Sequence, residues 1–591
     1  MSEIKRLVFG GLLCVATVAV PPLTACSRDA DGSGAANAAV EPGAAGQETA
    51  AEFAPEPGGE FEEPADSGSA QEDQPGEPPA AEPAVAPTTA VASEGSRENP
   101  RDGPGEHFVY ANPHVIGDLD PSSAFSSEHI VLQNVYETLT RLTDHDGTTT
   151  EQLSGVLAES WTANDDATVW TFTLREGVTF HDGTALTPQA VRDSLHRTID
   201  LGLGAAFILA PIEFMEAVDD RTIRFDLSYP APLDLIMSAN FGVYVISPNA
   251  VTQDNAWFNA GNAAGTGPYM LESHDPAVST RLVRYDDYWG GWSEGQVATV
   301  DIRLTEDPVL AQQLIRNSDA HYTFNLPFDV YDSLADRSGV DVVIGPSMIS
   351  LFGLLNTRRL SPEVREALVL SFPYDEITAS LYGGRAVRSR GIVPQAMWGS
   401  HPELEIPRTD LEAASRLLDD AGMTDISIIY SYDAGTIEQQ QIGEVWKAGL
   451  ATIGVDLVLE PLTFDARWAK AKADPDGAQD VFVMFWFPTF VSPYDFLYSV
   501  FHTEEEPFFN LGYFSNGEFD TLIDEADTLS GTDRYGAIEL FRRAQEILVD
   551  EHAGVFMLDV PQAQAIRSEF RGFVSNPAYS QVVRFYELHR R

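Results

Sequence analysis

The sequence contains only two cysteines, Cys14 and Cys26, and both lie near its start. The remainder of the chain has no thiol, which excludes a disulfide framework and a cysteine-ligated metal site there. A domain built from the residues after Cys26 must therefore be stabilised by its core alone.

Basic residues are also scarce. The chain has 36 Lys and Arg against 90 Asp and Glu, which gives a formal net charge of −54. Such an excess of negative charge argues against binding to nucleic acid and against adhesion to anionic lipid headgroups. It is compatible with an adaptation of solubility, for example to salt, and carries no information about a ligand.

Motifs of exported enzymes are missing as well. The chain has no Gly-x-Ser-x-Gly elbow and no His-Glu-x-x-His pair, and its His residues are scattered. The charged run His502–Glu506 fits an exposed loop, and Asp474–Asp480 fits a turn. We therefore expect no catalysis, no cofactor and no metal site. The hypothesis of an exported hydrolase would be supported by an Asp/Glu pair that faces a cleft at the separation used by glycosidases.

The N-terminus has the composition of an export signal. Lys5 and Arg6 precede an apolar run, Leu7–Val20, which is too short to cross a bilayer as a mature helix. Leu23-Thr24-Ala25-Cys26 resembles a bacterial lipobox, which implies that residues 1–25 are removed and that Cys26 carries lipid. The alternative is an ordinary secretory signal with an incidental cysteine.

Residues 26–105 are dominated by Ala, Pro, Gly, Glu and Ser and have almost no aromatic or branched apolar side chains. A segment of this composition cannot bury enough apolar surface to offset its chain entropy. We predict a disordered acidic tether. The residues from 106 onward are too many for a single core, so at least two lobes are expected.

The most informative stretch is Val156–Leu195. Trp170, Phe172 and Leu174 alternate with Val169, Thr171 and Thr173, which predicts a half-buried strand. Thr187 followed by Pro188 predicts a capped helix through Leu195. A further amphipathic stretch, 127–142, predicts a helix with Ile130, Val131, Val135 and Leu139 on one side.

The order Leu-Ala-Glu-Ser-Trp, polar turn, Trp-Thr-Phe-Thr-Leu-Arg-Glu-Gly-Val-Thr-Phe-His-Asp-Gly-Thr resembles the signature region of the extracellular solute-binding proteins of family 5. Other passages follow the same family's order: Asn134–Leu139, Gly265–Tyr269, Leu354–Thr357 with Ser361–Leu368, and Asp410–Gly422. Leu233–Ile246 resembles the family's apolar helix followed by a strand. The Gly-rich passage Gly265–Tyr269 lacks the Gly-Lys-Ser/Thr of a phosphate-binding loop, so we reject a phosphate-binding role for it.

The resemblance implies an α/β fold, periplasmic-binding-protein-like type II (cluster C), with two lobes, a hinge and an extra inserted subdomain in lobe one. On this basis we expect lobe one at 106–350, with the subdomain at about 150–260. Lobe two is expected at 351–558, and a return to lobe one at 559–591. The ligand would lie between the lobes.

Peptide binders of this family carry a Trp-x-x-Asp-Tyr passage whose Asp pairs with the α-amino group of the peptide. Here Trp486 matches, but Thr489 occupies the Asp position. A hydroxyl cannot neutralise a buried ammonium. Asp495 is the nearest carboxylate; it either substitutes for the missing Asp or caps the following helix.

Other candidate ligand contacts are aromatic. The rings of Phe487, Phe490 and Tyr494 would stack on a sugar or on an apolar part of a ligand. The alternative is that they pack in the core of the lobe. Trp398 resembles a family residue near the cleft, and Tyr136 lies either at the pocket rim or in the core. Arg385, Arg388 and Arg390 would meet a ligand carboxylate or form structural ion pairs.

The resemblance therefore favours the monomeric solute-binding lipoprotein of an ABC importer. It would sit on the outer face of the cytoplasmic membrane, with permease subunits as partners. A short peptide is the first expected ligand, followed by an oligosaccharide or related polar solute and then a metal chelate. A ligand-sensing receptor is the alternative of another class.

Overall fold

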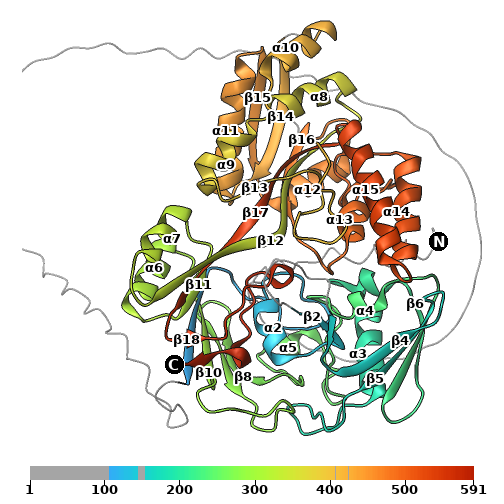
Figure 1. Ribbon diagram of the computed structural model, residues 1–591, viewed down its shortest axis with the longest axis vertical. Helices are drawn as coiled ribbons and strands as arrows, with labels where there is room; N and C mark the ends of the chain where they lie inside the picture. Colours follow the sequence, from blue (N-terminus) through green and yellow to red (C-terminus); the bar gives the residue numbers. More distant parts are fainter. Residues whose placement is uncertain (1–105, 144–152, 406–407, 424) are drawn as a thin grey trace, which may run out of the picture. The chain divides into compact units, whose positions relative to one another are not determined.

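Two long antiparallel strands, β12 (Val340–Leu355) and β17 (Gly554–Arg567), form the spine of the main sheet (Figure 1). The C-terminal part of β12 also pairs with β16 (Val481–Trp486), and the C-terminal part of β17 pairs with β11 (Tyr322–Phe324). Because different strands join at the two ends of this pair, the spine connects two otherwise separate sets of strands.

The first set, called here the β1 half, continues from β11 through β1 (His107–Asn112), β10 (Thr299–Leu304), β9 (Ser279–Arg284) and β8 (Tyr269–Asp275). The second set, the β14 half, comprises β16, β14 (Ile426–Asp433) and β15 (Val455–Leu462). β1 is parallel to β10 and β11, and β14 is parallel to β15 and β16. The sheet is thus mixed, and the expected lobe boundaries at 350 and 558 fall inside β12 and β17.

The structure is a computed structural model that describes residues 106–143, 153–405, 408–423 and 425–591, which belong to one compact unit. The predicted signal peptide, the tether and Cys26 lie outside the described residues. The remaining short strands are β2 (Thr140–Leu142), β3 (Leu153–Gly155), β13 (Val387–Arg388), β18 (Phe570–Arg571) and β19 (His589–Arg590).

Helices flank both halves of the sheet. Those whose buried residues share a core with the β1 half or its junction with the spine are α2 (His129–Val135), α5 (Asn255–Asn259), α6 (Pro308–Asn317) and α7 (Phe328–Ala335). Those that share a core with the β14 half are α8 (Pro362–Ser371), α9 (Tyr374–Tyr382), α10 (Leu411–Asp420) and α11 (Ile437–Ala451). A third core includes α12 (Phe464–Ala473), α13 (Pro493–Phe501), α14 (Gly517–Ser530) and α15 (Arg534–Asp550).

A separate antiparallel sheet has the order β4 (Ala158–Ala163), β5 (Val169–Leu174), β7 (Thr222–Leu227) and β6 (Ile212–Ala217). In β5, Trp170, Phe172 and Leu174 are buried, as their alternation predicts. The hydroxyl of Thr187 accepts a hydrogen bond from the Ala190 amide at 3.2 Å and caps α3 (Pro188–Leu201). The predicted strand and capped helix are therefore confirmed.

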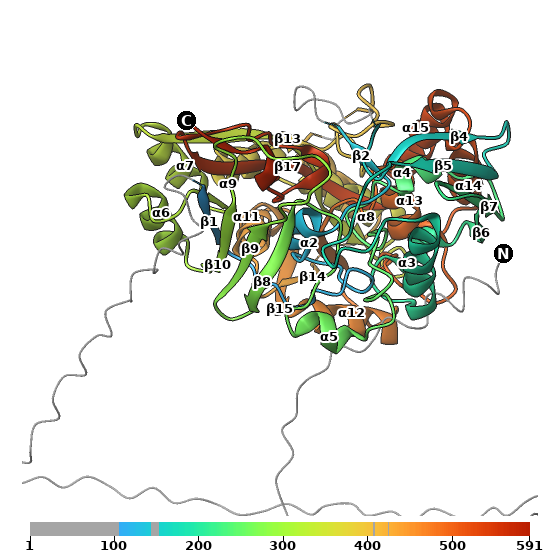
Figure 2. The same cartoon turned by 90° about the horizontal axis from the view of Figure 1, so that it is seen from below.

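This small sheet shares the third core with α14 and α15, and Figure 2 shows these elements together on one side of the molecule. An ion pair joins Arg534 of α15 to Asp234 of α4 (Leu233–Ile236) at 2.5 Å. A Cβ atom on Gly531 would come within 2.9 Å of the Ala167 side chain. The close approach of these backbones explains why a glycine stands at 531.

Two predicted elements are wrong. The helix expected over 127–142 ends at Val135, and Tyr136 is extended with φ −113° and ψ 162°. The Val135 carbonyl accepts the Gly267 amide at 3.0 Å, so a contact distant in sequence takes the place of the next helical bond. Of the helix and the strand expected over 233–246, the helix is present as α4, but among the described residues 243–246 form no strand.

The Gly-rich turn at 265–267 is what allows this ending. A side chain at Gly267 would lie 2.7 Å from the Asn134 carbonyl oxygen, and one at Gly265 would overlap the Val135 carbonyl. The glycines therefore admit a close backbone crossing instead of cradling phosphate.

We predict that Gly265→Ala lowers the free energy of unfolding by about 3 kcal/mol, because its new methyl group must displace backbone atoms. Gly117→Ala is the matched control, since nothing lies within 4 Å of a Cβ atom there. Thermal unfolding of both variants checks this, and equal midpoints for the two would contradict it.

Candidate functional site

The loop between β16 and α13, residues 487–492, begins directly after Trp486. The hydroxyl of Ser492 caps α13 by accepting the Tyr494 amide at 3.2 Å, and Pro493 occupies the first helical turn. This local sequence sets where the loop ends and where the first turn of α13 presents its side chains.

Asp495 lies in that first turn and is 1% exposed. Its Oδ2 atom accepts the Thr489 amide at 3.1 Å and the indole Nε1 of Trp486 at 3.4 Å. Its Oδ1 atom is buried and has no hydrogen-bond partner among the described residues. The interpretation of Asp495 as the helix cap is wrong, because Ser492 caps the helix. Asp495 instead joins the two ends of the loop.

Burial raises the pKa of Asp495 to about 7, although the bonds from Thr489 and Trp486 favour the ionised form. The group therefore changes charge near neutral pH. A cation placed at Oδ1 would stabilise the ionised form and would supply the partner that this atom lacks.

Thr489 is 3% exposed, and its carbonyl accepts the Asn240 amide at 3.3 Å. The side chain of Asn240 accepts from Gln133 Nε2 at 2.6 Å and donates to the Ala578 carbonyl at 3.1 Å. One buried asparagine thus connects the loop, helix α2 and the C-terminal segment. Sequence reasoning missed Asn240, because a single Asn in the stretch Met237-Ser238-Ala239-Asn240-Phe241 matches no motif.

Trp398 supports the loop from another side. It is 8% exposed, and its Nε1 atom donates to the Val491 carbonyl at 2.7 Å. Its ring packs edge-on against Phe541, with centroids 5.8 Å apart. Trp398 therefore packs against the loop and holds it through the Val491 carbonyl.

The other aromatic candidates differ in exposure. Phe490 is buried, and Tyr494 stacks on Tyr498 with ring centroids 4.8 Å apart. Phe487 is 51% exposed, so it is the ring of this loop that is free to contact a solute. Trp486 is partly buried and packs edge-on against Phe509 at 4.9 Å.

Tyr136 is apart from this cluster. It is 1% exposed, and its hydroxyl accepts the Ala264 amide at 3.4 Å. It lines a cavity of about 50 Å³, which is room for a few water molecules. Five of the six predicted site residues thus belong to the loop after β16 or contact it, namely Trp486, Phe487, Thr489, Asp495 and Trp398, and Tyr136 lies elsewhere.

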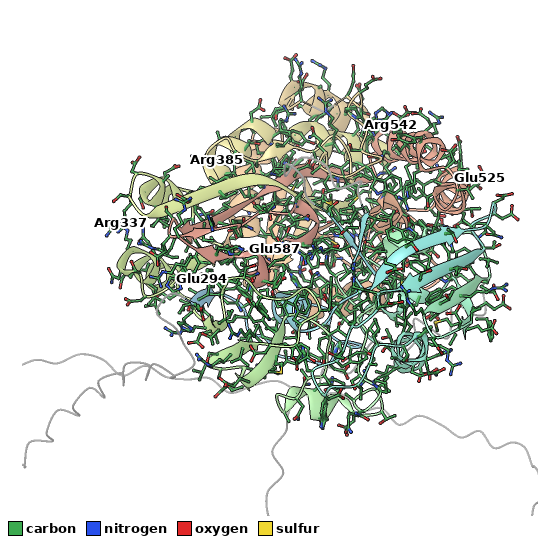
Figure 3. All side chains as sticks on the ribbon, turned by 60° about the horizontal axis from the view of Figure 1, so that its bottom comes forward. Glu294, Arg337, Arg385, Glu525, Arg542 and Glu587 are labelled. Carbon is green, nitrogen blue, oxygen red and sulfur yellow. The ribbon has the colours of Figure 1, made fainter. Side chains whose placement is uncertain are left out.

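The three candidate arginines are engaged within the protein. Arg385 pairs with Asp332 at 2.5 Å, and Arg388 pairs with Asp375 at 3.1 Å. Arg390 donates to the Leu404 carbonyl at 2.8 Å. Figure 3 shows Arg385 near the outer edge of the ribbon. These contacts support a structural role for the three arginines instead of binding to a ligand carboxylate.

Within the described ranges, no group of three or more His, Cys, Asp or Glu side chains could hold a metal ion. In the same part of the chain, no helix is both long and apolar enough to cross a membrane.

Comparison with known proteins gives consistent similarities. A family model described as bacterial extracellular solute-binding proteins, family 5 Middle, matches residues 152–508. The chain is 28% identical over 477 residues to the probable D,D-dipeptide-binding periplasmic protein DdpA of Escherichia coli (strain K12), covering 78% of this chain and 90% of that protein. It is 25% identical over 436 residues to the glutathione-binding protein GsiB of Salmonella typhimurium, covering 71% and 83%.

Solved structures show the same fold. The periplasmic binding protein DppA from Helicobacter pylori, in complex with the peptide STSA, superposes with a TM-score of 0.69 at 22% identity, over 82% of this chain and 98% of that one. NikA from Brucella suis, in complex with Fe(III)-EDTA, superposes with a TM-score of 0.73 at 18% identity, over 82% and 100%. The expected type II periplasmic-binding-protein-like fold is confirmed.

We predict that Asp495→Asn raises the thermal midpoint relative to the unchanged protein, and that this gain grows from pH 5 to pH 8. A carboxyl group whose pKa is higher in the folded chain stabilises it below the unfolded value near 3.9, and this contribution is lost as the pH rises through about 7. The asparagine cannot ionise, so we expect a gain of roughly 2 °C at pH 8 in the absence of solute. A difference that stays constant over this range would contradict the assignment.

Proposed function

Because the chain belongs to the bacterial extracellular solute-binding proteins of family 5, we propose that it captures a short peptide and delivers it to the permease of an ABC importer. It acts by binding alone, without catalysis. The two halves of the sheet close on the solute through the β12–β17 spine, which supplies the hinge.

The observation that carries the proposal is the unpartnered Oδ1 atom of Asp495. A peptide presents an α-ammonium group, which needs a buried carboxylate to offset its desolvation. Thr489 cannot provide this charge, but Asp495 stands beside it, with the Thr489 amide bound to its other oxygen. The carboxylate is thus supplied from the first turn of the helix that follows.

The other residues of the site have supporting roles in this proposal. Trp486 and Thr489 hold the Asp495 carboxylate, and Trp398 fixes the loop through Val491. Phe487 offers an exposed ring to a solute side chain. Tyr136 lies apart from these residues and lines a separate cavity.

The relatives support a peptide over the other solutes. The similar proteins are named for D,D-dipeptides, glutathione and dipeptides. An oligosaccharide or a metal chelate is the second candidate, because NikA, of the same fold, was solved with Fe(III)-EDTA. An aromatic ring as exposed as Phe487 would also stack on a sugar.

We further propose that the mature protein begins at Cys26, carries lipid there, and works as a monomer on the outer face of the cytoplasmic membrane. The lipobox-like residues Leu23–Cys26 support the anchor. Residues 26–105, through their length and composition, would let the domain reach a permease from the anchor. A sensing role, in which the closed form engages a receptor partner, is the alternative.

The ligand prediction is tested by thermal unfolding and calorimetry with free and N-acetylated peptides. A free peptide at 100 times its dissociation constant should stabilise the protein by about 2.7 kcal/mol. N-acetylation, or Asp495→Asn, should weaken binding by about 100-fold, because each removes one partner of a buried ion pair. Affinity for the free peptide should rise with pH up to about 7, since binding requires the ionised carboxylate.

Asp559→Asn is the matched control for that test. Asp559 is also a buried carboxyl group with a raised pKa, about 6, but both of its oxygens are bonded within the protein, to Ser389 Oγ and to the Gln395 amide. It should retain the affinity of the unchanged protein. Equal binding of free and acetylated peptides, or stabilisation by sugars or chelates alone, would reject the peptide proposal.

The anchor is tested by Cys26→Ala in the full-length gene. We expect the unchanged protein in the membrane fraction and the variant in the soluble extracytoplasmic fraction, because no lipid can be attached to alanine. Membrane association that survives the substitution would contradict the lipoprotein assignment.

A further inference from the structure

The turn between α14 and α15, residues 531–534, docks against the unit formed by the small sheet and α4, called here the inserted unit. A Cβ atom on Gly531 would lie 2.9 Å from the Ala167 side chain, so the two backbones approach closely at this point. In the same turn, Arg534 Nη2 lies 2.5 Å from Asp234 Oδ1. In Figure 1, α4 lies below the ends of α14 and α15. The contact is therefore both apolar and ionic.

This contact joins two portions of the chain that the spine separates. Ala167 and Asp234 precede β12, whereas α14 and α15 lie between β12 and β17. The Asn240 amide, which donates to the Thr489 carbonyl at 3.3 Å, crosses between the same two portions. The backbone connects these portions only through the two spine strands. A motion about the spine would therefore move Arg534 away from Asp234.

Both sides of the contact are held in place by further hydrogen bonds. On the inserted unit, the Trp170 indole donates to the Ala167 carbonyl at 3.1 Å, and the Thr140 hydroxyl donates to the Asp234 carbonyl at 2.7 Å. On the other side, Asp533 caps α15 by accepting a backbone amide at 3.0 Å. The two charged groups are therefore pre-organised to meet.

The ion pair is partly protected from water. The exposed fraction of the side chain is 12% for Asp234 and 33% for Arg534. Salt screens an attraction at this depth less than it screens one at the surface. A carboxylate that is buried to this extent and has no partner would be costly. The free energy of the contact therefore depends on the presence of both charges.

A groove of about 780 Å³ runs along the same contact. Four carboxylates line it, two from each side: Asp165 and Asp166 of the inserted unit, and Asp524 and Glu525 of α14. Among the described residues that line it none is basic, although His502 Nε2 lies 3.6 Å from Asp524. Figure 3 shows Glu525 at the outer edge of the molecule. Because like charges repel, the two sides resist approach, and the opposite charges of Arg534 and Asp234 offset this repulsion.

We propose that the Arg534–Asp234 ion pair is a latch that favours the closed form of the protein before a solute is captured. This inference rests on the closure proposed above and adds to it the contact that sets the closed fraction. A solute that binds only the closed form has an apparent affinity proportional to that fraction. The latch therefore raises the affinity for a solute without touching it.

A second ion pair crosses between the same portions of the chain but lies close to the spine. Arg385 pairs with Asp332 at 2.5 Å. Asp332 belongs to α7, which shares a core with β12, and Arg385 precedes β13, which pairs with β17. Since each partner is fixed to a spine strand, a motion about the spine changes their separation little. Arg385→Gln is therefore the matched control.

The test is a distance measurement by pulsed electron paramagnetic resonance on the full chain without added solute. Nitroxide labels are attached at Val218→Cys, on the inserted unit, and at Ile437→Cys, on α11, because both positions are exposed. Cys14→Ala and Cys26→Ala remove the two native cysteines, so that only the introduced ones are labelled. The closed form gives the shorter distance between the labels and the open form the longer one.

Arg534→Gln should raise the ratio of open to closed molecules about fivefold, because it leaves Asp234 without its partner. Arg534→Lys keeps the charge and should raise the ratio less. Asp234→Asn should act like Arg534→Gln, and the double variant should add nothing to the larger single effect, because the two residues form one interaction. Arg385→Gln should leave the ratio unchanged.

An unchanged ratio in Arg534→Gln would overturn the latch even if the thermal midpoint falls, because the pair would then stabilise the fold alone. An equal rise in Arg385→Gln would overturn it as well. Adding a free peptide to the unchanged protein tests closure separately. If the peptide never increases the share of the shorter distance, the proposed function fails, while the ratios without solute still decide the latch. Circular dichroism of each variant confirms that it is folded.

Discussion

The pairing of β12 with β17 is the interaction on which the rest of the structure depends. These strands are the ones that both halves of the main sheet share, so no other strand pair connects β11 to β16 within the described residues. Their register also places the site. Ser350 of β12 stands opposite Trp486 on one side and Asp559 on the other. The last residue of β16, and hence the loop after it, is held directly against the spine.

The local parts of this architecture could be predicted from the sequence. The alternation in β5 and the Thr187 cap of α3 depend only on neighbouring residues, and both are confirmed. The end of α2 could not be predicted in this way, because the Val135 carbonyl is taken by Gly267. A periodic pattern continues through Leu139, and that residue is indeed buried, but in an extended segment and not in a helix.

The same distinction applies to the candidate site. Trp486, Thr489 and Asp495 lie within ten positions of one another, so a single sequence motif could identify all three as candidates. Asn240 connects Gln133, 107 positions before it, with Thr489, which is also distant in the chain. No spacing rule covers such separations. The departure from the family pattern at Thr489 was visible in the sequence, but the burial of Asp495 and the lack of a partner for its Oδ1 atom among the described residues could be seen only in three dimensions.

The pairing of charges distinguishes Asp495 from the charged residues of the scaffold. Burying a charge without a partner is costly, so a buried ionisable group with an unsatisfied atom is a candidate for contact with a ligand. In this chain the paired charges, such as Arg197 with Asp120 and Arg534 with Asp234, join segments of the scaffold. Asp495 differs from these pairs, because it is buried and its Oδ1 atom has no hydrogen-bond partner among the described residues. Its other oxygen accepts the Thr489 amide and the Trp486 indole, so a cation bound at Oδ1 would contact the group that joins the two ends of the loop after β16. Recognition of a cationic solute and the ordering of this loop would then depend on the same carboxylate.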